Sequence, residues 1–300
     1  MIFATLTALV VYRADVRADA NSFNDGLGPR EIAVGESMRA NARGALATTL
    51  NPAGLALNRE LVFEGSYGYR TEDSASAVAV SACDSTTPVA GCFYYRYFSA
   101  SPELGGASLD RRAHEFGTVA ARQLSPRVLV GVAGKYFDYE SDNPEEGDSD
   151  GFGFDVGLTV RASDAVNVGL VGHNVWAVDS AQYPRAVAGG LALQPSRSLA
   201  ISLDGVWNLD TPEGESTGRY GGGAEYFISA SDMQSGYPLR VGAVYDHQLE
   251  STYLTAGVGS MTTKMGLDVG ARKQVDGGEE LMVHASLRVF GPRQPSPAGF

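Results

Sequence analysis

From Glu60 onward, apolar and polar residues alternate along the chain with a period of two. Within 152–161, for example, every even position is apolar, while the odd positions hold glycine, threonine or a charged residue. Successive side chains of a β-strand point to opposite faces, so each such segment has one apolar face and one face rich in charge or glycine. An amphipathic helix would repeat every 3.6 residues instead. The pattern therefore predicts β-strands.

Fourteen segments follow this pattern, and each is close to the roughly 9–11 residues that a tilted strand needs to cross a bilayer. They are 60–71, 73–84, 88–99, 113–123, 127–138, 151–162, 165–176, 184–193, 198–209, 218–228, 238–247, 252–260, 263–273 and 279–290. An even number suits a closed barrel whose two ends lie on the same side. The first hairpin and 113–123 alternate least clearly, so twelve strands is the alternative count.

The connections between these segments are sorted by length. The short links 85–87, 124–126, 163–164, 194–197 and 261–262 alternate with the longer links 100–112, 139–150, 177–183, 210–217 and 248–251. Link 229–237 breaks this order, because it is long where a short turn is expected. Tight periplasmic turns and longer outer loops are typical of a transmembrane barrel. A soluble β-sandwich has no reason to sort its connections in this way.

The alternation also assigns the two faces of the sheet. The apolar face carries aromatic residues near segment ends, as in interfacial girdles: Tyr67, Tyr69, Phe93, Tyr95, Tyr97, Tyr136, Trp176, Trp207, Tyr226 and Tyr245. The opposite, lumen-lining face carries Glu64, Arg96, Lys135, Asp155, Arg161, Asp204, Glu225, Arg240, Asp268, Arg272 and Arg288. A dry core does not hold so many charges, because each costs several kcal/mol unless paired. A soluble sheet with its charged face in solvent is the alternative.

The last segment ends on the aromatic Phe290 and looks like the final amphipathic strand by which outer-membrane proteins are commonly recognised for assembly. These observations predict an all-β fold, a closed antiparallel transmembrane β-barrel of about fourteen strands over 60–290. Residues 291–300 contain three prolines and are expected to trail into the periplasm.

Residues 1–20 are expected to be a secretory signal peptide. Residues 2–11 form an apolar run too short to span a bilayer, and Ala18, Asp19 and Ala20 form a cleavage site of the A-x-A type. No Lys or Arg precedes the apolar run, which a start codon assigned too late would explain.

Residues 21–59 do not alternate. The alanine-rich stretch 32–47, which contains Arg39 and Arg43, predicts a short helix. It is followed by the sequence Asn-Pro-Ala-Gly-Leu-Ala at 51–56, in which Asn-Pro and Gly mark a turn.

Here the chain resembles the outer-membrane long-chain fatty-acid transporter (FadL) family and its relatives, including the type IX secretion barrel that shuttles cargo proteins. Their mature chains carry an alanine-rich segment, this motif and the first strand in the same order. The motif match covers about 28–69, and the other strands match by count. The resemblance implies that 21–59 fold into the lumen as a hatch, with Asn51, Pro52 and Gly54 setting its turn. A periplasmic arm is the alternative.

If the segment lies in the lumen, we expect Arg30, Arg39 and Arg43 to pair with lumen carboxylates and to hold it without apolar packing. Cys83 and Cys92 flank a tight turn and share the inward face, so a cross-strand disulfide is within reach if the register places them opposite or diagonal.

Composition excludes several functions. The net charge of −12 argues against a nucleic-acid partner, whose binding surface is basic. No run of 18 apolar residues predicts a transmembrane helix. The four histidines lie in different strands without metal-ligand spacing, and the acidic stretch 142–150 lacks the ordered spacing of a calcium loop. We expect no catalytic residues, cofactor or metal.

The sequence thus predicts a bacterial outer-membrane barrel, surrounded by outer-membrane lipids, for passive transport of a small solute through a hatch-plugged lumen, with a hydrophobic solute as one candidate. Link 139–150 is acidic and 100–112 is polar, unlike the apolar outer loops with which the family captures fatty acids. Fatty acids as the ligand are therefore in doubt. The alternative is a non-transporting scaffold or shuttle for a surface or secretion complex.

Overall fold

The computed structural model describes residues 27–104, 107–144, 147–177, 182–210, 218–230, 235–276 and 278–291. The expected signal peptide, the first six residues of the expected hatch and the tail from residue 292 lie outside the described residues. Among the residues described, no helix is both long and apolar enough to cross a membrane.

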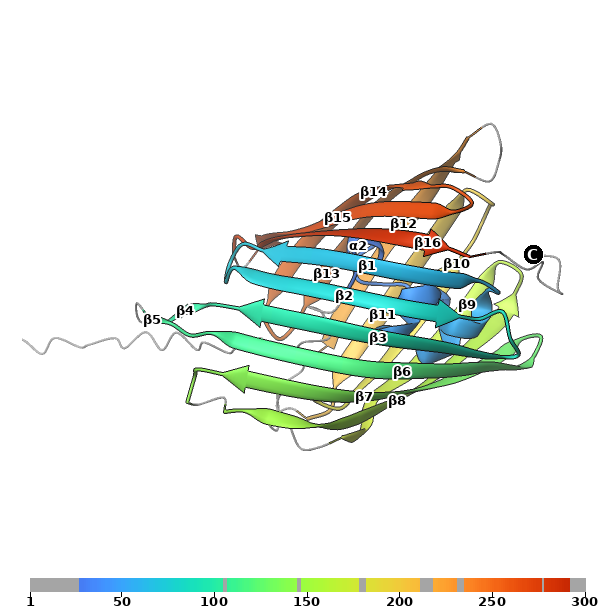
Figure 1. Cartoon of the computed structure of the whole chain (residues 1–300). Helices are drawn as coiled ribbons and strands as arrows, with labels where there is room; N and C mark the ends of the chain where they lie inside the picture. The colour runs from blue at the N-terminus through green and yellow to red at the C-terminus, as the bar shows by residue number, and fades with distance from the viewer. Residues whose placement is uncertain are drawn as a thin grey trace, which may run out of the picture.

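Fourteen of the described strands form one closed antiparallel barrel (Figure 1). They are β1 (Leu61–Arg70), β2 (Ala75–Asp84), β3 (Val89–Ala100), β6 (Arg111–Ser125), β7 (Val128–Ser141), β8 (Ser149–Ser163), β9 (Val166–Ala177), β10 (Ala186–Leu193), β11 (Leu199–Asn208), β12 (Gly218–Ser229), β13 (Gly236–Asp246), β14 (Ser251–Met261), β15 (Met265–Asp276) and β16 (Leu281–Phe290). Because β1 pairs with both β2 and β16, the sheet closes on itself. The count of fourteen is confirmed, and the observed bounds differ from those predicted by no more than three residues.

The alternation of faces is clearest in β16, where exposed and buried residues follow one another along the whole strand. Across the barrel, the outward positions include large apolar residues such as Leu203, Leu254 and Leu267, each more than half exposed. A soluble monomer seldom exposes so much contiguous apolar surface. An apolar outer surface of this kind is typical of a barrel that presents it to lipid.

Connections also differ between the two ends of the barrel. The turns 126–127, 164–165 and 262–264 lie at one end, where β1 begins and β16 ends, and we call this the short-turn end. The opposite end, which we call the long-loop end, carries the longer connections. One of them holds the two-stranded extension of β4 (Glu103–Leu104) and β5 (Ala107–Ser108). The sorting is incomplete, since 71–74 at the long-loop end is also a tight connection.

Residues 27–58, which we call the N-terminal segment, lie inside the barrel (Figure 1). The continuous helix predicted for 32–47 is wrong. The segment instead forms a short helix, α2 (Pro29–Ala33), and three 3-10 helices, η1 (Arg39–Asn41), η2 (Gly44–Thr48) and η3 (Pro52–Leu57).

Backbone geometry explains why the predicted helix breaks. Gly35, Glu36, Met38 and Gly44 have positive φ values of 69°, 56°, 121° and 59°. A continuous right-handed helix requires negative φ at every position, so it cannot run through these four residues, which lie between α2 and η1 and at the start of η2.

Candidate functional site in the barrel interior

The N-terminal segment contacts the wall on all sides. Helix α2 packs against β13 to β16, η1 against β9 and β10, η2 against β2, β3 and β6, and η3 against β3, β6, β7 and β8. A segment with neighbours around the whole circumference fills much of the lumen. The interior surface and this segment together form the candidate functional site.

Asn51 joins two parts of the segment to the wall. Its side-chain oxygen accepts a hydrogen bond from the Ala53 backbone N–H at 3.1 Å, which caps η3. Its side-chain N–H₂ donates to the carbonyl oxygen of Arg39 at 3.0 Å and to the hydroxyl of Thr159 on β8 at 3.2 Å. At Gly54, an added Cβ would lie 1.9 Å from the carbonyl oxygen of Ala42. The turn at 51–54 is therefore a packed contact between helices as well as a change of direction.

Two of the three expected arginine pairs are present. Arg30 bonds Glu64 at 3.0 Å, and Arg39 bonds Asp204 at 3.1 Å through its guanidinium and at 2.9 Å through its backbone N–H. Arg43 differs from them, because no carboxylate of the described chain lies within ion-pair distance of it, and the pair expected for it is not formed.

Glu36 forms an ion pair that the sequence did not suggest. Its carboxylate accepts hydrogen bonds from Arg219 on β12 at 2.7 and 2.8 Å and from Arg272 on β15. Burial by itself would raise the pKa of Glu36, but the two guanidinium groups outweigh burial and lower the pKa to about 2. The segment is thus anchored by a carboxylate that is ionised at neutral pH.

Glycines of the wall allow the backbone of the segment to approach closely. An added Cβ at Gly221 would lie 1.9 Å from the carbonyl oxygen of Gly35, and one at Gly270 would lie 2.1 Å from that of Pro29. Wall glycines whose added Cβ would come within 3.0 Å of the segment are Gly131, Gly157, Gly169, Gly190, Gly221, Gly223, Gly242, Gly257 and Gly270. Contacts below 3.0 Å are essentially forbidden to a real Cβ, so these positions exclude other residues while the segment is in place.

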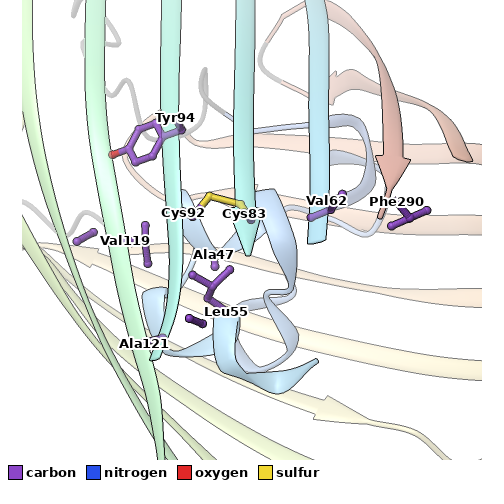
Figure 2. Close-up of a cluster of buried hydrophobic side chains, with 11 residues drawn as sticks. Ala47, Leu55, Val62, Cys83, Cys92, Tyr94, Val119, Ala121 and Phe290 are labelled. Carbon is purple, nitrogen blue, oxygen red and sulfur yellow. A yellow bond between two sulfur atoms is a disulfide. The ribbon is translucent and has the colours of Figure 1, made fainter. Parts of the chain in front are cut away.

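An apolar cluster also joins the segment to β1, β2, β3 and β6. Figure 2 shows Ala47 and Leu55 of the segment beside the disulfide between Cys83 and Cys92, which the register places directly opposite each other. Val62 belongs to the same cluster. The expectation that charge pairing holds the segment without apolar packing is therefore wrong. Inward alanines, valines and cysteines of these strands supply an apolar surface near the short-turn end, beside the inward charges Glu64, Arg96 and Glu115 of the same strands.

Most inward charges of the wall pair with one another. Asp268 accepts from Arg240 at 2.7 Å and from Arg288 at 2.6 Å, and Arg240 also bonds Glu225 at 2.6 Å. Further pairs among the described wall residues are Arg96 with Glu115 at 2.9 Å, Lys135 with Asp155 at 2.9 Å, Arg272 with Glu280 at 2.6 Å, and Arg219 with Asp246. Arg161 is different, because its guanidinium donates to the carbonyl oxygens of Leu57 and Pro126.

Sequence reasoning missed a cluster near the long-loop end. The β8–β9 register shifts beside Asp155, and its carboxylate accepts a hydrogen bond from the Asn174 backbone N–H at 2.7 Å. Asn174 has a φ of 51° and bonds the Pro184 carbonyl oxygen at 2.9 Å, while Tyr183 stacks on Phe137 at a ring distance of 3.9 Å. A bulge interrupts the period-two pattern. The pattern therefore contained no signal for this cluster.

Within the described residues, three of the interior cavities lie in series. A cavity of about 40 Å³ is lined by Leu27, Phe98 and Tyr183, and it shares Ser66, Ala79 and Arg96 with a second cavity of about 30 Å³. The second cavity shares Arg30 and Leu46 with a third, of about 740 Å³, at the short-turn end. The side chains of Arg30 and Leu46 therefore separate the largest cavity from the smaller two.

Among the described residues, no group of three His, Cys, Asp or Glu side chains is arranged to hold a metal ion.

No family model matches the chain, and no curated protein matches it by sequence. Solved structures do. The CymD monoaromatic hydrocarbon channel has a TM-score of 0.65 and 14% identity, with 88% of this chain and 97% of that chain covered. The toluene transporter TodX of Pseudomonas putida has a TM-score of 0.59 and 13% identity, with 88% and 98% covered. A FadL homologue of Pseudomonas aeruginosa has a TM-score of 0.61 and 10% identity, with 88% and 97% covered.

At these identities the likeness is one of fold. The chain has the barrel fold of FadL-type hydrocarbon transporters, as the motif at 51–56 led us to expect.

Proposed function

We propose that this chain is an outer-membrane channel for passive import of a small hydrophobic solute, with the N-terminal segment acting as its hatch. The observation that carries the proposal is the series of three cavities, which share lining residues from Tyr183 near the long-loop end to the short-turn end. The largest, about 740 Å³, is within the range of small-molecule sites, roughly 300–1,000 Å³. The apolar outer surface and the shared fold with hydrocarbon channels support the same function.

Passage would require movement at one place above all. Leu46 and Arg30 stand between the second and third cavities, and Arg30 is held there by its ion pair with Glu64. A rotamer change of Leu46, or a small shift of η2, would join the cavities without removing the whole segment. Because such a path does no chemical work, transport would follow the concentration gradient of the solute.

Substitutions at Leu46 test this path. Leu46→Ala should raise the uptake of radiolabelled toluene by cells that express the protein, and Leu46→Trp should lower it. The matched control is Leu50→Ala, another buried leucine of the segment that lines none of the three cavities described here. Uptake is normalised to the amount of folded barrel, measured by heat-modifiable electrophoretic mobility. Equal uptake in all four proteins would reject the path.

The anchoring of the segment favours a second candidate function. Glu36, Arg39 and Asn51 each bond the wall, and the wall glycines lock the backbone in place. A plug fixed so firmly suits a non-transporting scaffold for a surface or secretion complex.

Deletion of 27–50 should greatly increase single-channel conductance in planar bilayers if the segment is a hatch. An unchanged conductance, together with equal uptake in the Leu46 variants, would favour the scaffold.

A further inference from the structure

The largest cavity has a marked excess of positive charge. It opens among the short turns, where Arg127 and Asp164 line it, and it extends inward to Arg43 and Arg161. Seven arginines line it, against Glu60, Asp164 and Glu225 as its carboxylates. Three of the arginines, Arg30, Arg240 and Arg288, form ion pairs with carboxylates of the wall.

Four arginines of this cavity have no carboxylate partner within the described chain. Arg161 donates only to carbonyl oxygens, at 3.0 Å to Leu57 and 3.4 Å to Pro126. The guanidinium of Arg43 makes no hydrogen bond to the described residues, and its Nε atom is buried. Arg59 and Arg127 also line the cavity, and among the described residues neither guanidinium has a hydrogen-bond or ion-pair partner, although the backbone of Arg127 bonds Ser125 and Arg161.

Arg43 and Arg161 line the same cavity. Burial lowers the pKa of Arg43, attraction to Glu60 opposes this effect, and repulsion from Arg161 adds to it. The Arg43 guanidinium thus shares the cavity with a second cation and has no hydrogen-bond partner of its own among the described residues, and a charge with buried atoms needs a counter-charge or hydrogen bonds. A bound anion that bridges the two groups would supply both.

We propose that this cavity binds a phosphate group, with Arg43 and Arg161 as its main ligands and Arg59 and Arg127 at its mouth. A phosphate monoester carries a charge of roughly −1.5 to −2 at pH 7 and three acceptor oxygens, so it matches several guanidinium groups better than a carboxylate does. The planar guanidinium donates two parallel hydrogen bonds to such oxygens. The site goes beyond the proposed transport and does not depend on it.

The size and lining of the cavity indicate an organic phosphate. Its volume of about 740 Å³ is far larger than inorganic phosphate needs. Leu46, Leu57, Met261 and Phe290 line it together with the arginines, so an apolar group joined to the phosphate would also be accommodated. The phosphate has two sources, a soluble ester or the headgroup of a phospholipid. The two sources would present the same atoms to Arg43.

Calorimetric titration tests the proposal on the full-length barrel in maltoside detergent, which contains no phosphate. One arm uses glycerol 3-phosphate, a second uses phosphatidic acid in mixed micelles, and a third uses acetate. We expect saturable binding in at least one phosphate arm. Arg43→Gln and Arg161→Gln should each weaken it about tenfold or more, because each removes a charge-assisted contact.

The matched control is Arg197→Gln, an exposed arginine in the β10–β11 turn that does not line the cavity. It should bind like the unsubstituted protein. Binding of the soluble ester assigns a soluble source, and binding of phosphatidic acid alone assigns a lipid. The proposal is overturned by an absence of saturable phosphate binding, by equal binding in all variants, or by acetate binding as tightly as the phosphates. Heat-modifiable mobility confirms that each variant is folded.

Discussion

Neighbouring residues of one strand have opposite surroundings in this barrel. On β11, Leu203 is 52% exposed on the outer surface, whereas Asp204 next to it is buried and bonded to Arg39. In a transmembrane barrel an outer position meets lipid, where a charge has no partner and no water. The inner position faces a protein interior that supplies a counter-charge. The effect of a substitution on stability therefore depends on whether the position faces outward or into the barrel.

Arg at position 203 should be strongly destabilising. Leu203→Arg should lower the free energy of unfolding by about 2–4 kcal/mol, because it places a charge near the bilayer midplane. Leu209→Arg is the control, since Leu209 is 55% exposed but lies just beyond the end of β11. There the cost should be about 0–1 kcal/mol. Urea titration in lipid vesicles measures both, and equal losses would mean that the outer surface does not face lipid.

The charge of Glu36 should make stability depend on pH. Its folded pKa of about 2 lies below the ordinary value of 4.5, so ionised Glu36 stabilises the folded state above about pH 4.5. That contribution is lost as the pH falls toward 2. Glu36→Gln removes it at all pH values, at a cost of about 1–3 kcal/mol near neutral pH.

The measurement is the difference in unfolding free energy between Glu36→Gln and the unsubstituted protein, taken in detergent from pH 7 down to pH 2.5. We expect a constant difference above about pH 5 and a shrinking difference below it. A difference that stayed constant over the whole range would show that the carboxylate is not held charged by Arg219 and Arg272.

At the scale of elements, the N-terminal segment and the strands are stabilised in different ways. Strand pairing needs only the backbone, and the outer side chains need only be apolar. The segment depends on specific partners: ion pairs, the cap at Asn51, an apolar cluster and close contacts with glycine. It should therefore detach from the wall before the barrel unfolds.

A methyl group at a wall glycine should displace the segment. Gly221→Ala places a Cβ against the carbonyl oxygen of Gly35, whereas a Cβ at Gly65 meets nothing within 4 Å. Hydrogen exchange of 29–41 should therefore become at least tenfold faster in Gly221→Ala and stay unchanged in Gly65→Ala, with strand exchange unaffected in both. Protection of 29–41 that is equal in the two variants would mean that the segment is not held by these contacts.

For the whole molecule, the two ends of the barrel differ in both connections and charge. The short-turn end holds the start of β1, the end of β16 and the arginine-rich cavity. The other end holds the longer loops, including the acidic connection after β7. Barrels of this class keep short turns in the periplasm and longer loops outside. We therefore expect the cavity to open to the periplasm.

Epitope tags test this orientation. A tag inserted after Gly147, in the connection between β7 and β8, should be labelled by antibody on intact cells. A tag placed after Gly291, beyond the end of β16, should be labelled only when the outer membrane has been permeabilised. The reverse labelling would invert the barrel and place the arginine-rich cavity at the cell surface.

The sequence by itself determined the barrel. Period-two alternation located all fourteen strands and indicated which residues face inward, because strand geometry links each side chain to a face whatever its neighbours are. The inward charges could be named from this rule, among them Asp155, Asp268 and Arg288. The motif at 51–56 also indicated the turn at Asn51, since a cap is a local interaction.

Only the tertiary structure decided what fills the barrel. The path of 27–58 has no period, and its positive φ values at Glu36 and Met38 arise where distant strands bind it. Gly221 and Gly223 of β12 and Gly270 of β15 contact the N-terminal segment, but nothing in the sequence around them indicates this contact. Whether an arginine is paired depends on which residues meet across the lumen. Arg39 meets Asp204 from a strand 165 residues away, and Arg43, four residues along the chain, meets no carboxylate of the described chain.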